Sequence, residues 1–262
     1  MIIANVCVCC GNSDLQRDPA MLMPFVAQRI FDWKPFMIFG LRDVPNGMAY
    51  ALCSTLRCNQ CGLMFLDMRF NNDEMRRLYR DYRGKEYTEL RDSHEPGYTF
   101  RNQRLIHENH KGIVEEFLTV GNIPRSILDY GGGDGTKTPF TSRAQICDVY
   151  DIGDGPVLTG NKVQLLEGQY DLVVCAHVLE HVPQPQVCLY EIRQVMHTES
   201  MLYIELPLED MGPKHHWHEH INFFTKASLY CLLERSGFEV IAYRETNVNS
   251  SNLIMLTARR VA

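Results

Sequence analysis

Short apolar runs bounded by glycine, acidic or polar residues recur along the second half of the chain. They lie at residues 126–130, 145–150, 171–175, 201–207, 237–243 and 253–258. Runs of this length between turn residues are typical of buried strands. The stretches 186–197 and 226–236 are predicted as helices, and Thr225 is placed to cap the second one. Strands that alternate with helices predict an α/β fold with a largely parallel sheet.

The first half of the chain has a less regular pattern. Residues 49–56 and 63–66 are predicted as short strands. Residues 73–82 are predicted as a helix that begins after one of two asparagines, because acidic residues lie early in it and basic residues later. Residues 104–118 are predicted as a second helix that leads into the α/β part of the chain.

This pattern divides the 262 residues into a β-rich module (1–66), a helical connector (67–111) and an α/β domain (112–262). A composition of 45% hydrophobic and 22% charged residues is that of a soluble globular protein. The net charge of −6 and the isoelectric point of about 5.9 argue against a nucleic-acid partner. We expect no membrane helix and no signal peptide, because neither a long apolar run nor a basic stretch before one occurs.

The ten cysteines fall into two groups. Five of them stand alone in mostly apolar contexts, which indicates a reducing, cytoplasmic location. The others include two C-x-x-C-G pairs, formed by Cys7 with Cys10 and by Cys58 with Cys61. Two thiolates at this spacing can hold one metal from a tight turn, so the pairs predict a structural zinc site with four thiolate ligands. Cys9 could replace a neighbour, and two merely buried or redox-active pairs are the alternative to zinc.

The glycine-rich segment 131–135 directly follows the apolar run 126–130. Its glycines are spaced G-x-G-x-G, which is tighter than the G-x-G-x-x-G of a dinucleotide site. The nearby carboxylates of Asp129 and Asp134 disfavour a phosphate and suit a ligand that is cationic or rich in hydroxyls. S-adenosylmethionine (SAM) carries a sulfonium, an ammonium and a ribose, and therefore fits this description.

Residues 126–135 resemble the cofactor loop of class I SAM-dependent methyltransferases, and residues 171–182 resemble their fourth-strand motif, D-L-V-V-x-x-x-V-L-E-H-V. The resemblance implies a Rossmann-like core of seven strands, the last one antiparallel. Asp151 would hold the cofactor ribose, with Asp148 as the weaker alternative because it lies inside a strand. The implied cofactor-binding residues are Asp129, Gly131, Gly132, Gly133, Asp134, Gly135, Asp151, Ile152, Ala176, His177 and Val178.

Candidate catalytic residues follow predicted strands or lie in the connector. His181 and His220 come after the carboxyl ends of strands, where α/β sheets bind their ligands, and Tyr82 lies in the connector. Each of them, or His218, could accept a proton from the group that is methylated. His181 could equally be a structural histidine.

Two stretches are rich in side chains that bind polar ligands. Residues 79–101 contain many tyrosines and arginines, which predicts either a lid over the cleft or an ordinary solvated surface. Residues 214–225 contain four histidines and Glu219. These are metal-binding residue types, but the H-E-x-x-H pattern of a zinc helix is missing from the stretch, so we favour a substrate-binding loop.

The order of cysteine pairs, Tyr/Arg-rich connector and core resembles bacterial sugar methyltransferases, including deoxysugar C-methyltransferases, over most of residues 5–260. We expect the core to extend to the end of the chain, without their long C-terminal domain. The resemblance implies methylation of a sugar or nucleotide-linked sugar in surface-polysaccharide or secondary-metabolite biosynthesis, on oxygen, nitrogen or carbon. A zinc-ribbon rRNA or tRNA methyltransferase is the alternative, and residues 175–178 lack its N/D-P-P-Y/F motif. A non-catalytic interaction module is the second alternative.

Overall fold

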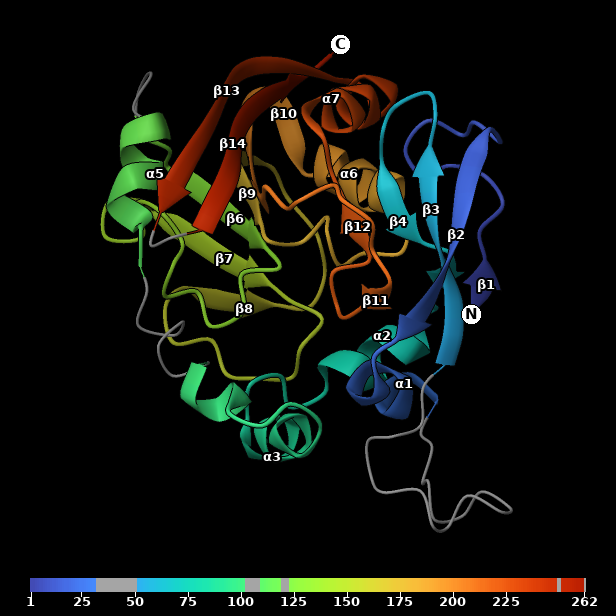
Figure 1. Cartoon of the computed structure of the whole chain (residues 1–262). Coiled ribbons are helices and arrows are strands. Elements are labelled where there is room, and N and C mark those ends of the chain that lie inside the picture. The colour runs from blue at the N-terminus through green and yellow to red at the C-terminus, as the bar shows by residue number, and fades with distance from the viewer. Residues whose placement is uncertain (32–50, 102–108, 119–122, 249–250, 262) are drawn as a thin grey trace.

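The structure is a computed structural model that describes residues 1–31, 51–101, 109–118, 123–248 and 251–261. It contains a large sheet of seven strands and a smaller one of five, which lie side by side in Figure 1. A two-stranded pairing of β1 (Ile2–Ile3) with β5 (Met68–Arg69) adjoins the smaller sheet. None of the helices in the described ranges is long and apolar enough to cross a membrane.

The large sheet has the seven strands and the antiparallel last strand that the family resemblance implied. Its order is β13 (Phe238–Val248), β14 (Ser251–Arg260), β10 (Met196–Pro207), β9 (Tyr170–Ala176), β6 (Ser126–Tyr130), β7 (Ile146–Tyr150) and β8 (Asn161–Val163). Strand β14 is antiparallel to both of its neighbours, and the other pairs are parallel. This confirms the seven-stranded Rossmann-like fold. The sequence pattern missed β8, because its first two residues are polar and exposed.

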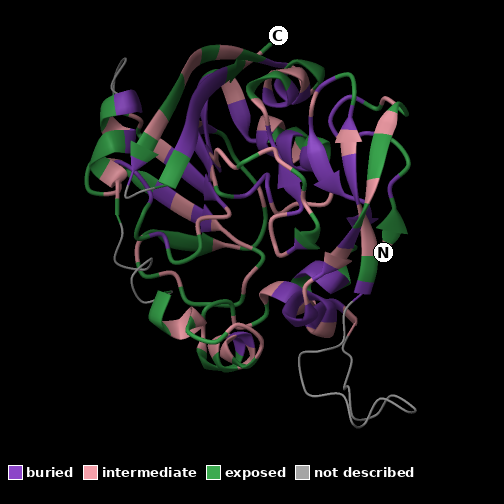
Figure 2. Ribbon diagram, viewed as in Figure 1, coloured by how far each residue is buried: buried purple, intermediate pink, exposed green. Residues whose placement is uncertain are grey.

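Alternate side chains of the sheet enter two separate cores, as the pleat of a strand requires. Ile127 of β6 packs with α5 (Lys111–Leu118) on one face, whereas its neighbour Leu128 packs on the other face, with α6 (Pro185–Gln194) and α7 (Lys226–Arg235). The central strands are therefore buried on both sides, as Figure 2 shows. Helices α6 and α7 also contact the smaller sheet, so they join the two halves of the molecule.

Several boundaries differ from the predicted ones. The helix expected over 186–197 ends at Gln194, because Met196 already pairs with Tyr170 as the start of β10. The helix expected over 73–82 is α2 (Asn72–Tyr79), and Asn71 caps it by accepting a hydrogen bond from the Glu74 amide at 2.9 Å. Residues 49–50 and 104–108, which belonged to a predicted strand and helix, lie outside the described residues.

The smaller sheet combines segments from distant parts of the chain. Its order is β11 (His216–Trp217), β2 (Leu15–Leu22), β3 (Ala51–Cys58), β4 (Met64–Leu66) and β12 (Asn222–Phe223). Two of these strands come from the histidine-rich stretch that follows β10. A core of large side chains, including Phe25, Trp217 and Phe223, joins this sheet to α1 (Pro24–Phe31), α2 and α3 (Lys85–His94).

Candidate functional site

The glycine loop after β6 is a tight turn that side chains would disrupt. The Gly131 amide donates to the Tyr150 carbonyl at 2.7 Å, which joins the ends of β6 and β7. Gly131 has a φ of +79° and Gly135 a φ of +75°, a region that L-residues rarely adopt. A Cβ at Gly131 would lie 2.4 Å from Val178, and one at Gly135 would lie 2.0 Å from the Thr159 carbonyl oxygen. The sequence therefore needs glycine here for the backbone path itself.

Asp151 lies at the end of β7 and holds the glycine loop. Its Oδ2 accepts a hydrogen bond from the Gly133 amide at 2.9 Å, while the next side chain, Ile152, is 49% exposed. Each carboxylate oxygen can accept a second bond, so Asp151 keeps capacity for a ligand hydroxyl. Asp148 points elsewhere, because its carboxylate accepts from the Tyr170 hydroxyl at 2.8 Å.

The two acidic residues beside the loop have different surroundings. Asp129 is buried under the loop, next to Gly132, and accepts a hydrogen bond from the Thr138 hydroxyl. Burial raises the pKa of Asp129 to about 6, although the Thr138 bond acts in the opposite direction. Asp134 is exposed, and its carboxylate accepts from the amide of Thr136 at 2.9 Å, which stabilises the turn.

Residues at the carboxyl end of β9 lie along the same edge of the sheet. Ala176 ends the strand, Val178 packs on the glycine loop, and His177 between them has a φ of +55°. The His177 ring bridges two buried carboxylates, with Nδ1 3.2 Å from Glu180 and Nε2 3.0 Å from Glu205. Burial lowers the pKa of His177, but these two carboxylates outweigh it and raise the pKa to about 10.

Glu205 is a buried carboxylate that the sequence reading missed. It lies in β10 and accepts hydrogen bonds from the Tyr203 hydroxyl at 2.6 Å and from His110 at 2.9 Å, besides its contact with His177. Burial raises the pKa of Glu205, but the hydrogen bonds from the two histidines lower it by more. The sequence signal for Glu205 was an acidic residue inside an otherwise apolar strand. A carboxylate that is buried there needs hydrogen-bond donors or a positive charge beside it.

His181 and His220 lie against each other, although 38 residues separate their segments. Their ring centroids are 4.6 Å apart. His181 Nδ1 lies 2.8 Å from the Tyr79 hydroxyl and 3.1 Å from the Glu219 carbonyl oxygen, and His220 Nδ1 lies 3.0 Å from Glu209. Burial and the nearby His220 lower the pKa of His181 to about 4, so this imidazole is neutral at physiological pH.

The connector packs onto the histidine-bearing stretch. Tyr82 is 39% exposed and lies edge-on to Tyr87, whose hydroxyl donates to Glu219 at 2.6 Å. Arg91 of α3 forms a buried ion pair with the same Glu219 and lies 3.5 Å from His218. Burial raises the pKa of Glu219, but Arg91 and Tyr87 outweigh it and lower the pKa to about 2. Side chains from three segments therefore meet here.

Arg69 ties the fourth-strand motif to the smaller sheet. Its guanidinium is buried and donates to the Pro183 carbonyl at 2.7 Å and to the Asn222 side chain at 2.7 Å. Asn222 in turn donates to the Leu179 carbonyl at 2.8 Å. These bonds position the segment that carries His181 against the segment that carries His220.

The four predicted metal ligands come together in one buried cluster. Their sulfurs all lie within 4.8 Å of one another, with 3.6 Å between Cys7 and Cys61 and 3.4 Å between Cys10 and Cys58. All four are free thiols rather than disulfides. Four ligands at about 2.3 Å from a tetrahedral zinc would be about 3.8 Å apart, so the cluster could hold this ion. Cys9 lies outside this group of four, and its amide donates to the Cys7 sulfur at 3.5 Å.

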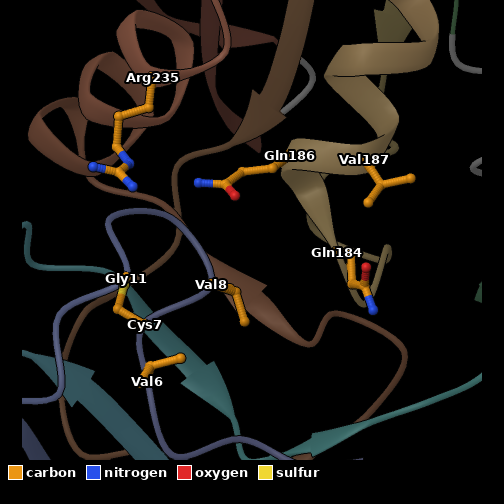
Figure 3. Close-up of a pocket in the computed structure, with 8 residues that line it drawn as sticks. All are labelled: Val6, Cys7, Val8, Gly11, Gln184, Gln186, Val187 and Arg235. Carbon is orange, nitrogen blue, oxygen red and sulfur yellow. The ribbon is translucent and has the colours of Figure 1, made fainter.

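A cavity of about 270 Å³ adjoins the first cysteine loop (Figure 3). It is lined by Val6, Cys7, Val8, Gly11, Gln184, Gln186, Val187 and Arg235. Gln186 donates to the Cys9 carbonyl at 2.8 Å, which joins α6 to the cysteine loop. The cavity contains none of the residues at the glycine loop or the histidine pair.

A family model described as a methyltransferase domain matches residues 100–243. No curated protein matches the chain. A solved structure of Burkholderia thailandensis 1,6-didemethyltoxoflavin-N1-methyltransferase, with its substrate and S-adenosylhomocysteine, matches with a TM-score of 0.52 and 18% identity over 68% of this chain and 90% of that one. A structure of magnesium protoporphyrin IX methyltransferase from Synechocystis PCC 6803 matches with a TM-score of 0.46 and 17% identity, over 66% of this chain and 99% of that one.

Proposed function

The chain belongs to this family of methyltransferase domains and is a SAM-dependent methyltransferase, and we propose that it methylates a small polar metabolite, a sugar or a nucleotide-linked sugar. The observation that carries the acceptor class is the set of side chains that meet beyond the glycine loop. Two imidazoles, a tyrosine hydroxyl and a carboxylate gather there, from His181, His220, Tyr79 and Glu209. Such groups are suited to binding several hydroxyls of one ligand.

The proposed cofactor site is the edge formed by the ends of β6, β7 and β9. Asp151 accepts hydrogen bonds from the ribose hydroxyls, beside Ile152. The loop 131–135 lets the backbone approach the ligand closely, because three of its glycines have positive φ. The carboxylate of Asp129 favours the positive charge of SAM, and residues 176–178 line the remaining side.

The proposed acceptor site is the neighbouring histidine pair. The sulfonium is a good leaving group, so the protein mainly aligns acceptor, methyl carbon and sulfur, which supplies up to about 7–11 kcal/mol. A hydroxyl or carbon acid must also lose a proton. We place this activation at His181 and His220, with Tyr82 as the third catalytic candidate. Both imidazoles have their Nδ1 atoms in contact with protein groups, which leaves Nε2 for the acceptor.

We also propose that the four-cysteine cluster binds a structural zinc ion. The sulfur separations of 3.4 and 3.6 Å and the burial of all four residues support it. Four thiolates fill the tetrahedral positions, so the ion has no open site for a substrate and acts by joining the two cysteine loops. A cytoplasmic location fits free thiols and stays a prediction.

The test is a methylation assay with purified protein. The protein is incubated with SAM and a panel of monosaccharides, nucleotide-linked sugars and ribosomal RNA, and each acceptor is examined for a mass gain of one methyl group. We expect the gain on a sugar and its loss in Asp151→Ala. A gain on RNA alone would overturn the proposed acceptor class, and full activity of Asp151→Ala would overturn the cofactor site.

A further inference from the structure

Three potential metal ligands from two distant segments converge beside the proposed acceptor site. One carboxylate oxygen of Glu180, one ring nitrogen of His181 and one ring nitrogen of His220 lie within 4.8 Å of one another. We propose that these three side chains bind a divalent transition-metal ion, which in turn binds the methyl acceptor. The binding of the ion stands on these residues alone, whereas its role in catalysis rests on the proposed function.

The two imidazoles are arranged as metal-binding histidines usually are. In metal sites the ring nitrogen that does not bind the metal typically donates its hydrogen to a carbonyl or carboxylate. His181 Nδ1 lies 2.8 Å from the Tyr79 hydroxyl and 3.1 Å from the Glu219 carbonyl oxygen, and both oxygens can accept its hydrogen in the tautomer that binds a metal through Nε2. His220 Nδ1 lies 3.0 Å from the Glu209 carboxylate. These bonds leave the Nε2 lone pair of each ring for the ion.

Glu180 supplies an independent observation. The residue is 1% exposed, and its Oε1 lies 3.2 Å from His177 Nδ1. Its other oxygen, Oε2, is buried and makes no hydrogen bond to any residue that the structure describes. A buried carboxylate oxygen without a partner is costly. The Oε1 atom of the same carboxylate lies 3.9 Å from His181 Nε2, so a cation bound beside the two imidazoles would offset the cost of burying this carboxylate.

The ligand set indicates the class of ion. Two imidazoles with one carboxylate suit zinc, manganese, iron or cobalt in the divalent state rather than calcium. Bonds of about 2.0–2.2 Å place neighbouring ligand atoms about 3–3.6 Å apart, so the side chains need only small rotations to close on an ion. Three protein ligands leave a position open, unlike the four thiolates of the cysteine cluster. That open position is where an acceptor oxygen binds.

The ion gives a route for activating a hydroxyl acceptor. An oxygen bound to a divalent metal has a lowered pKa. Because the Nε2 lone pairs then bind the ion, His181 and His220 activate the acceptor through the ion and not as bases. The O–H bond breaks and the proton passes to water. The oxygen lone pair then forms a bond to the methyl carbon of SAM while the carbon–sulfur bond breaks, which leaves S-adenosylhomocysteine.

Cobalt provides the test, because its absorption distinguishes the two kinds of site. The purified full chain, with zinc in its cysteine cluster, is titrated with Co²⁺ and analysed for bound metal and visible absorption. We expect one bound equivalent with d–d bands and without the charge-transfer band of cobalt thiolates. His220→Ala and Glu180→Gln should weaken its binding at least about tenfold, and Glu209→Gln, which keeps all three ligands, about 10–100-fold. His216→Ala removes an exposed histidine of the same stretch and should leave the affinity for cobalt unchanged.

Two results would overturn the metal site: no cobalt outside the thiolates, or equal affinity in wild type, His220→Ala and Glu180→Gln. Calorimetry with SAM on the same samples separates this failure from that of the proposed function. SAM binding without cobalt binding overturns the metal site alone. Cobalt binding without SAM binding overturns the proposed function and leaves the metal site in place.

Discussion

Gly135 shows how one residue without a side chain sets the path of the glycine loop 131–135. We predict that Gly135→Ala abolishes measurable SAM binding and destabilises the fold. The left-handed conformation at φ +75° costs an L-residue about 1–2 kcal/mol, and a Cβ 2.0 Å from the Thr159 carbonyl oxygen forces the backbone to move. Calorimetry and thermal unfolding measure both effects. In Gly155→Ala, where a Cβ meets nothing within 4 Å, both should be unchanged.

Asp129 gives SAM binding a predicted pH dependence. Its pKa, raised by burial to about 6, means that the carboxylate becomes neutral as the pH falls through this value. A neutral acid attracts the cationic cofactor less, so the affinity for SAM should fall by up to about tenfold between pH 7 and pH 5. Calorimetry at both values measures the change. If Asp129→Asn lost as much SAM affinity between pH 7 and pH 5 as the wild type does, another group would be responsible for the pH dependence.

At the scale of elements, the ion pair between Arg91 and Glu219 joins α3 to the segment between β11 and β12. Its side chains are 7% and 12% exposed, so removing one partner leaves a buried charge unpaired. We predict that Arg91→Met lowers the free energy of unfolding by about 3–5 kcal/mol, measured by urea denaturation at pH 7. Arg76→Met removes a pair that is 64% and 77% exposed and should cost less than about 0.5 kcal/mol.

The same pair has a pH signature. Arg91 and Tyr87 lower the pKa of Glu219 to about 2. The stabilisation that the ionised Glu219 gives to the fold is therefore fully present above pH 4.5, the ordinary pKa of a glutamate, and is lost as the pH falls toward 2. Wild-type stability should decline over this range more steeply than that of Arg91→Met. Parallel slopes would contradict the assignment of this stabilisation to Arg91.

At the scale of the whole molecule, the smaller sheet links the cysteine cluster to the proposed acceptor site through the pairing of β4 with β12. We predict that Cys58→Ser abolishes zinc binding, lowers the melting temperature, and speeds amide exchange in β2–β4 and in residues 216–223. Strand β12 pairs with β4, which follows the second cysteine loop. Loss of the metal should therefore destabilise β4 and, through it, β12. Exchange in β6 and β7 should not change. Cys53→Ser, which alters a cysteine of β3 outside the cluster, is the control.

The outcomes of the sequence predictions differ between the two sides of the molecule for a physical reason. Strands β6, β9, β10 and β14 could be predicted because each contains a contiguous run of residues that is largely apolar and buried. Strand β8 was missed because it is three residues long and its first two residues are polar and exposed at the edge of the sheet. Strands β11 and β12 are two residues each, and only their partners β2 and β4 hold them in the extended form. No local pattern marks such pieces.

The sequence by itself determined the α/β class of the main domain and the tight turn of the glycine loop, because a buried strand and a turn depend on neighbouring residues. Only the tertiary structure decided which side chains meet at the proposed acceptor site. His181 meets Tyr79 across 102 residues, and Arg91 meets Glu219 across 128. Such pairs depend on strand register and on the packing of helices against two sheets. The residue types of the acceptor site could therefore be read along the chain, but their arrangement could not.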